Sequence, residues 1–467
     1  MIPMSLAEIA AAVEGRLSET ADPEALVTGG IEHDSRKAGP GGLFLALPGE
    51  KVDGHDFAPA AAAQGTVAAV ASRQIDSPAV YVEDGLRALA DLAREVARRS
   101  PATVVGVTGS NGKTSTKDII GQLCASLGPT VATEGNFNNE LGHPYTVCRV
   151  EPDTRYLVLE LAARGVGHIT ELCEIAPPSI GVVLNVGISH LDGFGSIETT
   201  AEAKSELPRF LAPEGTAVLN ADDPRVAAMA DRTRAQVLTF GVTEPADIAA
   251  VDLDPGDGRH RFTLRTPDGD AAVRLRLWGG HHVHNALAAA AVAWRLGASP
   301  DHIADRLSEA GRRSERRMDV FTLPDGTTVI DDSYNANPAS MGAAIRALGQ
   351  LPTAGRRIAV LGLMADLEEL SDECHRRAGA QAAEAGVDEL IAIGDGTLPI
   401  IEGAAGDDHR TGGADGVAAA THVPDQTAAI ELLRNRLRPG DTVLVKGSRH
   451  RTWDVADHLR AKEDNDQ

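Results

Sequence analysis

The sequence predicts an α/β protein of three domains. Its 467 residues correspond to about three domains at roughly 150 residues each. Hydrophobic residues make up 43% and charged residues 24%, which is typical of folded globular proteins. Short apolar segments alternate with helical stretches along most of the chain, and this order is typical of a parallel sheet between helix layers. Breaks near residues 101 and 313 divide the chain into 1–101, 102–313 and 314–467.

The first domain is predicted to be a smaller α/β unit. The apolar run Gly42 to Leu47 indicates a strand, and Pro-Gly and Asp-Gly pairs mark turns around it. A helix is expected over Gly85 to Arg99. Pro101 then ends the helical pattern, because proline disfavours a helical conformation in the residue before it.

The second domain begins with the buried strand Thr103 to Val107, which leads directly into a glycine-rich loop. Further apolar segments alternate with helical lengths and predict a central parallel sheet. These segments are Tyr156 to Glu160, Ile180 to Leu184 and Ala217 to Leu219. A hairpin around Pro267-Asp-Gly269, with strands Arg261 to Arg265 and Val273 to Leu277, is expected at the sheet edge.

The third domain is expected to be Rossmann-like. It follows a polar segment, Glu309 to Arg317, of the composition typical of a linker. A second hairpin is predicted around Pro324-Asp-Gly326. Three apolar strands then follow, separated by helical lengths: Ile358 to Leu361, Glu389 to Ile393 and Thr442 to Val445.

The composition excludes several classes of function. The chain carries 44 Lys and Arg against 67 Asp and Glu, a net charge of −23 that repels polyanions, so we expect no nucleic-acid partner. There is no signal-peptide pattern and no run of ~18 apolar residues, so we expect no membrane insertion and a cytoplasmic location. The cysteines form no C-x-x-C pair and are expected to be inert buried residues: Cys124, Cys148, Cys173 and Cys374.

The strongest chemical signal is Gly106-Val-Thr-Gly-Ser-Asn-Gly-Lys-Thr114, between a strand and a helix. Backbone N–H groups of such a loop point at an anion, Lys113 can neutralise phosphate charge, and Thr114 can offer a hydroxyl to magnesium. Five residues separate Gly106 from Gly112 where the strict phosphate-loop pattern has four, so this is a variant loop. A chance glycine-rich turn is the alternative, but strand, loop, Lys-Thr and helix all occur in the required order.

Two polar residues follow predicted strands, where ligands bind in open α/β sheets. Glu160 ends one strand and could hold magnesium, although an acid at a strand end can also be a solvated residue or a helix cap. His190 follows the next strand in Asn-Val-Gly-Ile-Ser-His, and by itself it favours a structural histidine. The phosphate loop upstream favours the functional interpretation of Glu160.

Three other segments allow a functional or a structural interpretation. Lys204 lies in a charged helical stretch and would ordinarily be a surface lysine. The histidines of Gly280-His-His-Val-His-Asn285 lack an acid or cysteine at ligand spacing, so a zinc site is not expected. The polar segment Asp331 to Pro338 can cap a turn and a helix, or it can contact a ligand.

The order of the motifs TGSNGKT, NFNNELGHP, NVGISHLDGFGS, AKSEL, LNADDP, DDSYNANP and KGSRHRTWD resembles the Mur ligases over nearly the whole chain. DDSYNANP resembles the type that adds D-alanyl-D-alanine, and the Asn-Pro-Arg signature of the sister that adds diaminopimelate or lysine is not evident. Two positions depart from the family pattern, His282 in place of Asn and His168 after Ala162-Ala163, and neither is assigned a role.

The resemblance implies a set of site residues. ATP phosphates bind Gly109, Ser110, Asn111, Gly112, Lys113, Thr114 and Ser115, and the rest of the nucleotide binds Asn285, Arg317, Asp332, Tyr334 and Asn335. Magnesium binds Thr114, Glu160, His190 and a carbamylated Lys204, with Lys113, His190 and Lys204 catalytic. The uridine-linked substrate contacts Ser35, Arg36 and Asn138, and Lys446 to Arg449 lie on the side of the amino substrate.

The implied activity is ATP-dependent ligation of D-alanyl-D-alanine to UDP-N-acetylmuramoyl-tripeptide through an acyl phosphate, in peptidoglycan precursor synthesis. ATP and Mg²⁺ are then required, and we expect a monomer. Two alternatives remain: another ligase of the superfamily, including a folylpolyglutamate synthase, and a phosphate-loop ATPase that acts as a conformational switch.

Overall fold

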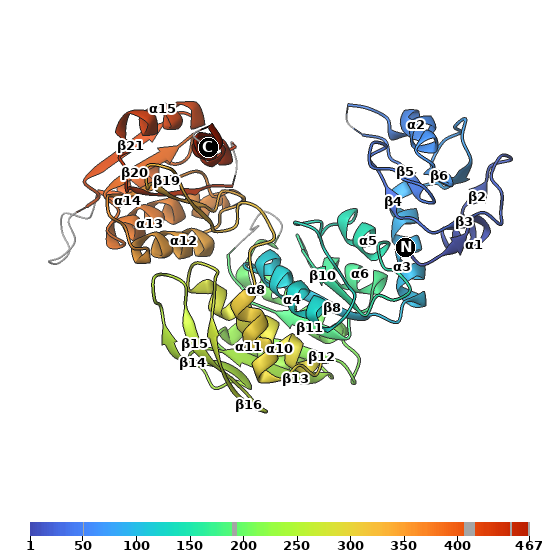
Figure 1. Ribbon diagram of the computed structural model, residues 1–467, viewed down its shortest axis with the longest axis horizontal. Coiled ribbons are helices and arrows are strands. Elements are labelled where there is room, and N and C mark those ends of the chain that lie inside the picture. Colours follow the sequence, from blue (N-terminus) through green and yellow to red (C-terminus); the bar gives the residue numbers. More distant parts are fainter. Residues whose placement is uncertain (50, 189–193, 406–415, 449–450, 466–467) are drawn as a thin grey trace.

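The computed structural model describes residues 1–49, 51–188, 194–405, 416–448 and 451–465, and for residues 462–465 only the backbone. Within these residues the strands form three large sheets and one small two-stranded sheet. In Figure 1 the N-terminal part (blue) and the C-terminal part (orange to red) stand at opposite ends of the central sheet, on the same side of it. No described helix is long and apolar enough to cross a membrane.

The N-terminal part is a five-stranded sheet in the order β2-β7-β6-β5-β4, parallel except for the β2–β7 pair. Its strands are β2 (Arg16–Leu17), β4 (Ile31–Glu32), β5 (Leu43–Ala46), β6 (Ala68–Ala71) and β7 (Ala79–Tyr81), and β1 (Met4–Ser5) pairs with β3 (Leu26–Val27). Its helices are α1 (Leu6–Ala12), η1 (Gly54–Phe57), α2 (Ala58–Ala63) and α3 (Gly85–Arg99). The predicted bounds of α3 are confirmed, and Asp84 caps its N-terminus.

The central part is a nine-stranded sheet in the order β16-β15-β14-β13-β12-β11-β8-β10-β9. Its parallel strands are β8 (Thr103–Thr108), β9 (Thr130–Ala132), β10 (Tyr156–Glu160), β11 (Ile180–Val183), β12 (Thr216–Asn220), β13 (Gln236–Gly241) and β14 (Ile248–Asp254). β15 (Arg261–Thr266) and β16 (Gly269–Arg274) extend the sheet antiparallel. Three of these strands, β9, β13 and β14, were not predicted as separate elements from the sequence.

Helices cover both faces of the central sheet, as the sequence predicts. One face carries α4 (Lys113–Leu127), α10 (His281–Arg295) and α11 (Pro300–Glu309), and the other carries α5 (Gly142–Val147), α6 (His168–Ile175) and α8 (Ile197–Phe210). The short α9 (Pro224–Ala227) and η2 (Ala228–Arg232) follow β12. Helix α3 packs against α5 and α6, so the N-terminal and central parts share one hydrophobic core.

The predicted hairpin lies at the sheet edge, but the prediction of its second strand is wrong. The strand spans Gly269–Arg274 and not Val273 to Leu277. Thr266 pairs directly with Gly269, so Pro267 and Asp268 alone make the turn and the second strand begins at once. Gly269 has φ 137°, a conformation that glycine adopts more readily than other residues.

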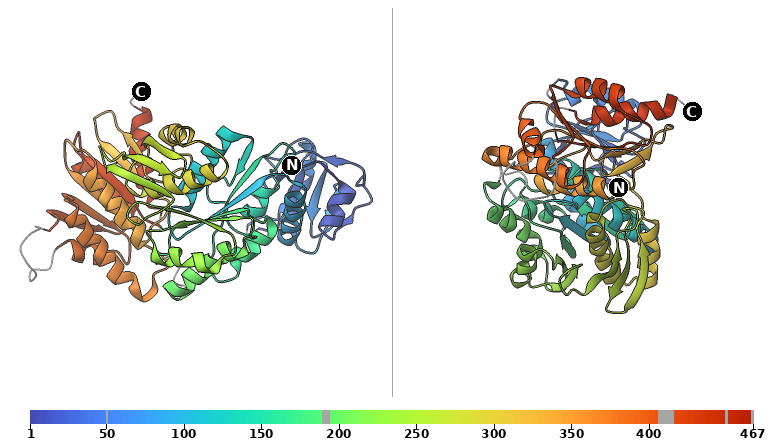
Figure 2. Two further views of the ribbon diagram at one scale, coloured as in Figure 1. Left: turned by 90° about the horizontal axis from the view of Figure 1, so that it is seen from below. Right: turned by 90° about the vertical axis from the view of Figure 1, so that its left-hand side faces the viewer.

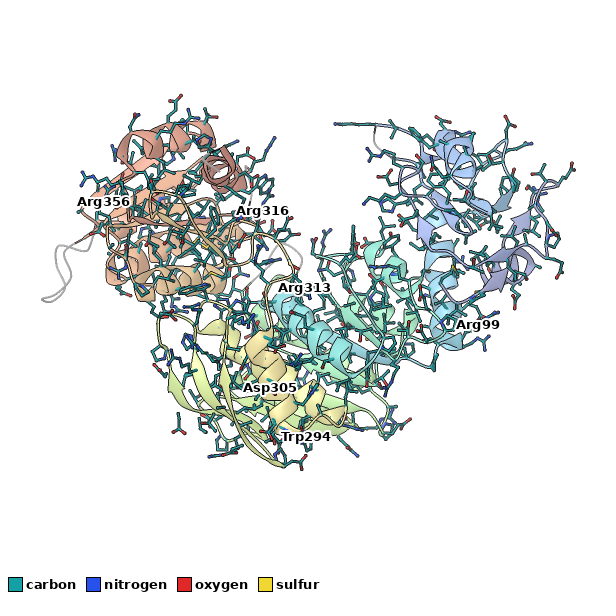
Figure 3. The ribbon with its side chains drawn as sticks, viewed as in Figure 1. Arg99, Trp294, Asp305, Arg313, Arg316 and Arg356 are labelled. Carbon is teal, nitrogen blue, oxygen red and sulfur yellow. The ribbon has the colours of Figure 1, made fainter. Side chains whose placement is uncertain are left out.

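The C-terminal part is a six-stranded sheet in the order β17-β18-β22-β19-β20-β21. The predicted hairpin joins β17 (Asp319–Thr322) to β18 (Thr328–Asp331), and β19 (Arg357–Leu361), β20 (Glu389–Ile393), β21 (Ala419–Val423) and β22 (Thr442–Lys446) run parallel to β18. One face packs on α12 (Pro338–Gln350), α13 (Ser371–Glu384), preceded by η3 (Glu368–Leu370), and α14 (Leu398–Ala404), and the other packs on α15 (Gln426–Arg436) and α16 (Trp453–Asn465). Figure 2 shows this layered part at one end of an elongated molecule.

Candidate active site

A tight loop connects β8 to α4 at the carboxyl end of the central sheet. Gly112 caps α4 in a left-handed conformation with φ 81°, and a Cβ there would lie 2.7 Å from Oδ1 of Asn285. A Cβ on Gly109 would lie 2.9 Å from Cβ of Leu184. Both positions therefore require glycine, and the loop presents the N-terminus of the 15-residue helix α4 to an anion.

Side chains from two distant segments hold this loop in shape, and sequence analysis assigned them no role. The backbone N–H of Asn111 donates to Oδ1 of Asn185 at 2.8 Å, and Nδ2 of Asn185 donates back to the carbonyl of Asn111 at 3.1 Å. From the C-terminal part, Nδ2 of Asn337 donates to Oδ1 of Asn111 at 2.7 Å. Asn185 follows the end of β11 and Asn337 caps the N-terminus of α12. Both lie in motifs already singled out, which is the signal that could have identified them.

Lys113 is the first residue of α4, directly after the loop. Its Nζ donates to the carbonyl of Gly109 at 2.7 Å, and no carboxylate among the described residues lies within ion-pair distance of it. Burial lowers the pKa of Lys113, Glu160 raises it, and Arg317 lowers it further. The next residue, Thr114, is buried in the first turn of α4. The loop therefore holds a cation without a neutralising acid, as a site for phosphate requires.

Glu160 ends β10 and is 1% exposed. Its Oε1 accepts a hydrogen bond from Nδ2 of Asn138 at 2.7 Å, whereas its buried Oε2 has no partner among the described residues. A buried carboxylate oxygen without a donor is unfavourable unless a ligand or a cation completes it. Hard oxygen donors such as Glu160 and the Thr114 hydroxyl suit magnesium.

Lys204 is buried in α8, with 4% of its surface exposed, so the surface interpretation of this lysine is wrong. Burial, and to a lesser degree the nearby charge of Lys113, lower the pKa of its amine to about 7. Its Nζ lies 5.8 Å from the ring centroid of Phe194. The amine of Lys204 is thus largely neutral and nucleophilic near pH 8, which a surface lysine is not.

The predicted nucleotide residues of the C-terminal part lie around the ends of β18 and β22. The guanidinium of Arg317 stacks over the half-exposed ring of Tyr334, 4.1 Å from its centroid. Nζ of Lys446 donates to Oδ2 of Asp332 at 2.5 Å and to the carbonyl of Asn335 at 3.0 Å. Lys446 is 1% exposed, so its ammonium supports this turn.

The residues predicted to bind the uridine end lie in the N-terminal part and are more exposed than the buried residues of the central sheet. Arg36 is exposed, and its guanidinium pairs with Asp34, which holds the pKa of that carboxyl well below its usual range. Ser35 lies beside it, half-buried. His190 and Arg449 lie outside the described residues.

Of the histidines that follow Gly280, His282 is buried and His281 and His284 are partly exposed. No group of three metal-ligating side chains occurs in the described parts of the chain. His281 and His282 stack with their ring centroids 4.2 Å apart, and burial lowers the pKa of His281 to about 4. All four cysteines are free, and Cys124, Cys148 and Cys173 are buried as predicted. The prediction is wrong for Cys374, which is only partly buried.

Comparison with known families gives three matches along the chain. Residues 28–96 match the Mur ligase family, catalytic domain; residues 107–293 match the Mur ligase middle domain; residues 316–449 match the Mur ligase, glutamate ligase domain. Together they span the three sheets.

Individual proteins match over nearly full length. The chain is 47% identical to UDP-N-acetylmuramoyl-tripeptide–D-alanyl-D-alanine ligase of Mycobacterium tuberculosis, covering 96% of each chain. A crystal structure of MurF from Acinetobacter baumannii is 31% identical with a TM-score of 0.85, covering 98% of this chain and 99% of that one. MurF ligase from Thermotoga maritima, in complex with ADP, is 30% identical with a TM-score of 0.79, covering 94% of this chain and 99% of that one.

Proposed function

The chain belongs to the Mur ligase family, and we propose that its described site joins D-alanyl-D-alanine to UDP-N-acetylmuramoyl-tripeptide at the expense of ATP. The chain is an ATP-dependent ligase of the MurF type, which serves peptidoglycan precursor synthesis. The observation that supports the residue assignment best is the open Oε2 of Glu160, buried at the same sheet end as Lys113.

The reaction has two steps. A carboxylate is a poor electrophile, so the terminal carboxylate of the tripeptide first attacks the γ-phosphorus of ATP and gives an acyl phosphate and ADP. The amine of D-alanyl-D-alanine then attacks the acyl carbon, and phosphate leaves from the tetrahedral intermediate as the amine loses its proton. Lys113 and the N–H groups of the loop stabilise charge on the transferred phosphoryl group.

Thr114 and Glu160 are the described residues that would hold magnesium. When bound, magnesium offsets phosphate charge and orients the phosphoryl group. The open oxygen of Glu160 and the hydroxyl of Thr114 are both hard donors, and magnesium usually takes one or two such protein ligands besides phosphate and water. His190 is proposed as a further ligand on the family resemblance alone.

Lys204 is proposed to be carbamylated. Its neutral amine attacks carbon dioxide, a nitrogen–carbon bond forms and the nitrogen releases one proton, which converts the neutral amine into an anionic oxygen donor. The pKa of about 7 supports this step, because only the unprotonated amine is nucleophilic. The anionic product would balance the charge of Lys113 and of a bound cation.

The division of labour among the three parts is proposed as follows. Residues 1–101, with Ser35 and Arg36, bind the uridine end; residues 102–313 bind ATP phosphates; and residues 314–467 contribute to nucleotide and amino-substrate binding. Asn138 would contact the sugar end near Glu160, since its amide already donates to that carboxylate. Closure of the parts would exclude water from the acyl phosphate.

Because its substrates are ATP and a nucleotide-linked sugar, we propose that the enzyme acts in the cytoplasm. We also propose that it is a monomer.

The test is phosphate release with ATP, Mg²⁺ and UDP-N-acetylmuramoyl-tripeptide, with and without D-alanyl-D-alanine. Tripeptides ending in diaminopimelate and in lysine are compared in parallel. We expect release to depend on the dipeptide and to match formation of the pentapeptide product. Faster addition of a single amino acid, or of glutamate to a folate, would indicate another ligase of the superfamily. Phosphate release without any amine would indicate an ATPase switch.

A further inference from the structure

A buried lysine in α4, which no step of the reaction uses, is connected to the backbone of Glu160 through one residue, Thr133. Lys117 is 1% exposed, and its Nζ forms an ion pair with Asp118. The same Nζ donates to the carbonyl of Thr133 at 2.7 Å. Thr133 directly follows β9, the edge strand that pairs with β10.

Thr133 replaces a main-chain bond of the sheet with a side-chain bond. Its N–H donates to the carbonyl of Val158 at 3.0 Å, which continues the parallel β9–β10 ladder. In a regular parallel ladder, the N–H of Glu160 would then donate to the carbonyl of Thr133. That carbonyl instead accepts from Lys117, and the N–H of Glu160 donates to Oγ1 of Thr133 at 3.1 Å.

We propose that Thr133 is a positioning residue for Glu160, and that Lys117 holds Thr133 in the orientation this requires. The hydroxyl fixes the backbone at the last residue of β10, from which the carboxylate extends with one oxygen on Asn138 and the other open. Groups that orient a metal ligand commonly change metal affinity about 10-fold to 100-fold when they are removed. The inference rests on the proposed role of Glu160 as a magnesium ligand.

The alternative is that Lys117 and Thr133 only stabilise the packing of α4 against β9. Both roles predict a loss of stability on mutation, so stability does not separate them. Metal affinity does, because a packing role leaves the carboxylate where it is once the protein is folded.

The experiment measures binding of Mn²⁺, which accepts the same oxygen ligands, to the full chain at saturating ADP, by the EPR signal of free Mn²⁺. An ADP-only blank corrects for binding to the nucleotide alone. Thr133→Val removes the hydroxyl with little change in volume, and Thr133→Ser keeps it. Thr130→Val makes the same substitution in β9, where the hydroxyl donates to the carbonyl of Gly128 and does not accept from the N–H of Glu160. Urea unfolding establishes that each variant is folded.

We expect Thr133→Val to weaken Mn²⁺ binding about tenfold, and Thr133→Ser and Thr130→Val to stay within about twofold of wild type. Replacing both charges in Lys117→Met/Asp118→Asn is expected to weaken binding about fivefold, because Thr133 then loses the donor to its carbonyl. Equal affinity of the Val and Ser variants would overturn the role of Thr133. Wild-type affinity of the double variant would overturn the role of Lys117.

Glu160→Gln separates this inference from the proposed function. If that variant binds Mn²⁺ like wild type, Glu160 is not a ligand, and both the metal assignment and the positioning role fail. If Glu160→Gln loses binding while Thr133→Val keeps it, the metal assignment stands and only the positioning role is refuted.

Discussion

Two sheets of this molecule end in an acid at the carboxyl edge, and the two acids are treated in opposite ways. Glu160 ends β10 in the central sheet, and its Oε2 has no partner in the described parts of the chain. Asp332 directly follows β18 in the C-terminal sheet, and both of its oxygens accept hydrogen bonds, from the N–H of Met318 at 3.1 Å and from Nζ of Lys446 at 2.5 Å. An acid at a strand end is therefore not by itself a ligand site. Whether neighbouring residues provide hydrogen-bond or ion-pair partners for both carboxylate oxygens decides the role of the acid.

The same contrast extends to the lysines. Lys446 is buried against a carboxylate, whereas Lys113 and Lys204 lie near one another without an ion-pair partner among the described residues. The carboxyl end of the central sheet thus holds a negative and a positive charge without ion-pair partners among the described residues. A bound cation would pair with the negative charge, and the phosphates of a nucleotide would pair with the positive charge. The C-terminal sheet end is already neutralised, and it offers the exposed ring of Tyr334 stacked with Arg317.

Replacement of Lys113 should give the largest effect. Lys113→Ala removes the cation from the phosphate loop, and we expect turnover to fall about 10³-fold. Within the described residues the side chain bonds only to loop carbonyls, so the free energy of unfolding should change by less than about 1 kcal/mol. Turnover and urea unfolding are measured on the same preparation. A folded variant with near-normal turnover would contradict the phosphate-loop assignment.

Lys204→Ala should reduce turnover by about 10²-fold, because an anionic ligand is lost if the lysine is carbamylated. Formate or acetate should partly restore it by filling the vacated space. With labelled bicarbonate, wild-type protein should give a carbamate ¹³C signal that is strong at pH 8 and weak below pH 7, where the amine is protonated.

Stability provides an independent check on the environment of Lys204. Its pKa is about 7 in the folded chain and about 10.5 in the unfolded chain, so the unfolded chain binds more protons between these values. Without bicarbonate, the stability of wild type relative to Lys204→Met should therefore rise with pH across this window. A flat difference, together with an active Lys204→Ala variant and no carbamate signal, would return Lys204 to a structural role.

We expect Asp332, which is paired with Lys446, to contribute to the free energy of unfolding, and Glu160 to contribute nothing. Asp332→Asn leaves the buried ammonium of Lys446 without its counter-ion and should cost about 3 kcal/mol of unfolding free energy. Asp332→Asn/Lys446→Met removes both charges and should recover most of that loss. Glu160→Gln should cost nothing, because it removes an incompletely satisfied carboxylate. Urea unfolding of the three variants tests the comparison, and a larger loss from Glu160→Gln would reverse it.

Asp331, the last residue of β18, should show the smallest effect. Burial raises the pKa of its carboxyl, against the hydrogen bonds that Ser333 donates to it. The folded chain then binds more protons than the unfolded chain just above pH 4, so this group lowers stability as pH rises through its folded pKa. Asp331→Asn should stay within about 1 kcal/mol of wild type at pH 8, and its relative stability should decline toward pH 4. An increase toward pH 4 would contradict the raised pKa.

The sequence predicts this molecule well where the determinants are local. The strand Tyr156–Glu160 and the helix Gly85–Arg99 have the predicted bounds, because an apolar run and a capped amphipathic pattern are complete within a few residues. The loop between β8 and α4 was also predicted from contiguous residues. The second strand of the hairpin was misplaced because its start depends on the number of turn residues, which the alternation of side chains does not fix.

The contacts that complete the site join residues far apart in the chain, and sequence patterns do not show them. Asn337 reaches the phosphate loop from 226 residues away, and Lys446 pairs with Asp332 from 114 residues away. Lys204 resembles a surface lysine by its charged neighbours, and only packing shows that it is buried. Thr133 had no signal at all, since its role depends on where β9 ends relative to β10.

The most direct test of the central claim is Mn²⁺ binding at saturating ADP by Glu160→Gln and Asp332→Asn. Each variant is compared with wild type in the absence of urea, at a temperature where all three proteins are folded. The open carboxylate should be the ligand, so Glu160→Gln should weaken Mn²⁺ binding by at least about tenfold, while Asp332→Asn should stay within about threefold of wild type. Equal losses in the two variants, or wild-type binding by Glu160→Gln, would contradict the claim that the unpartnered oxygen at the end of β10 marks the metal site.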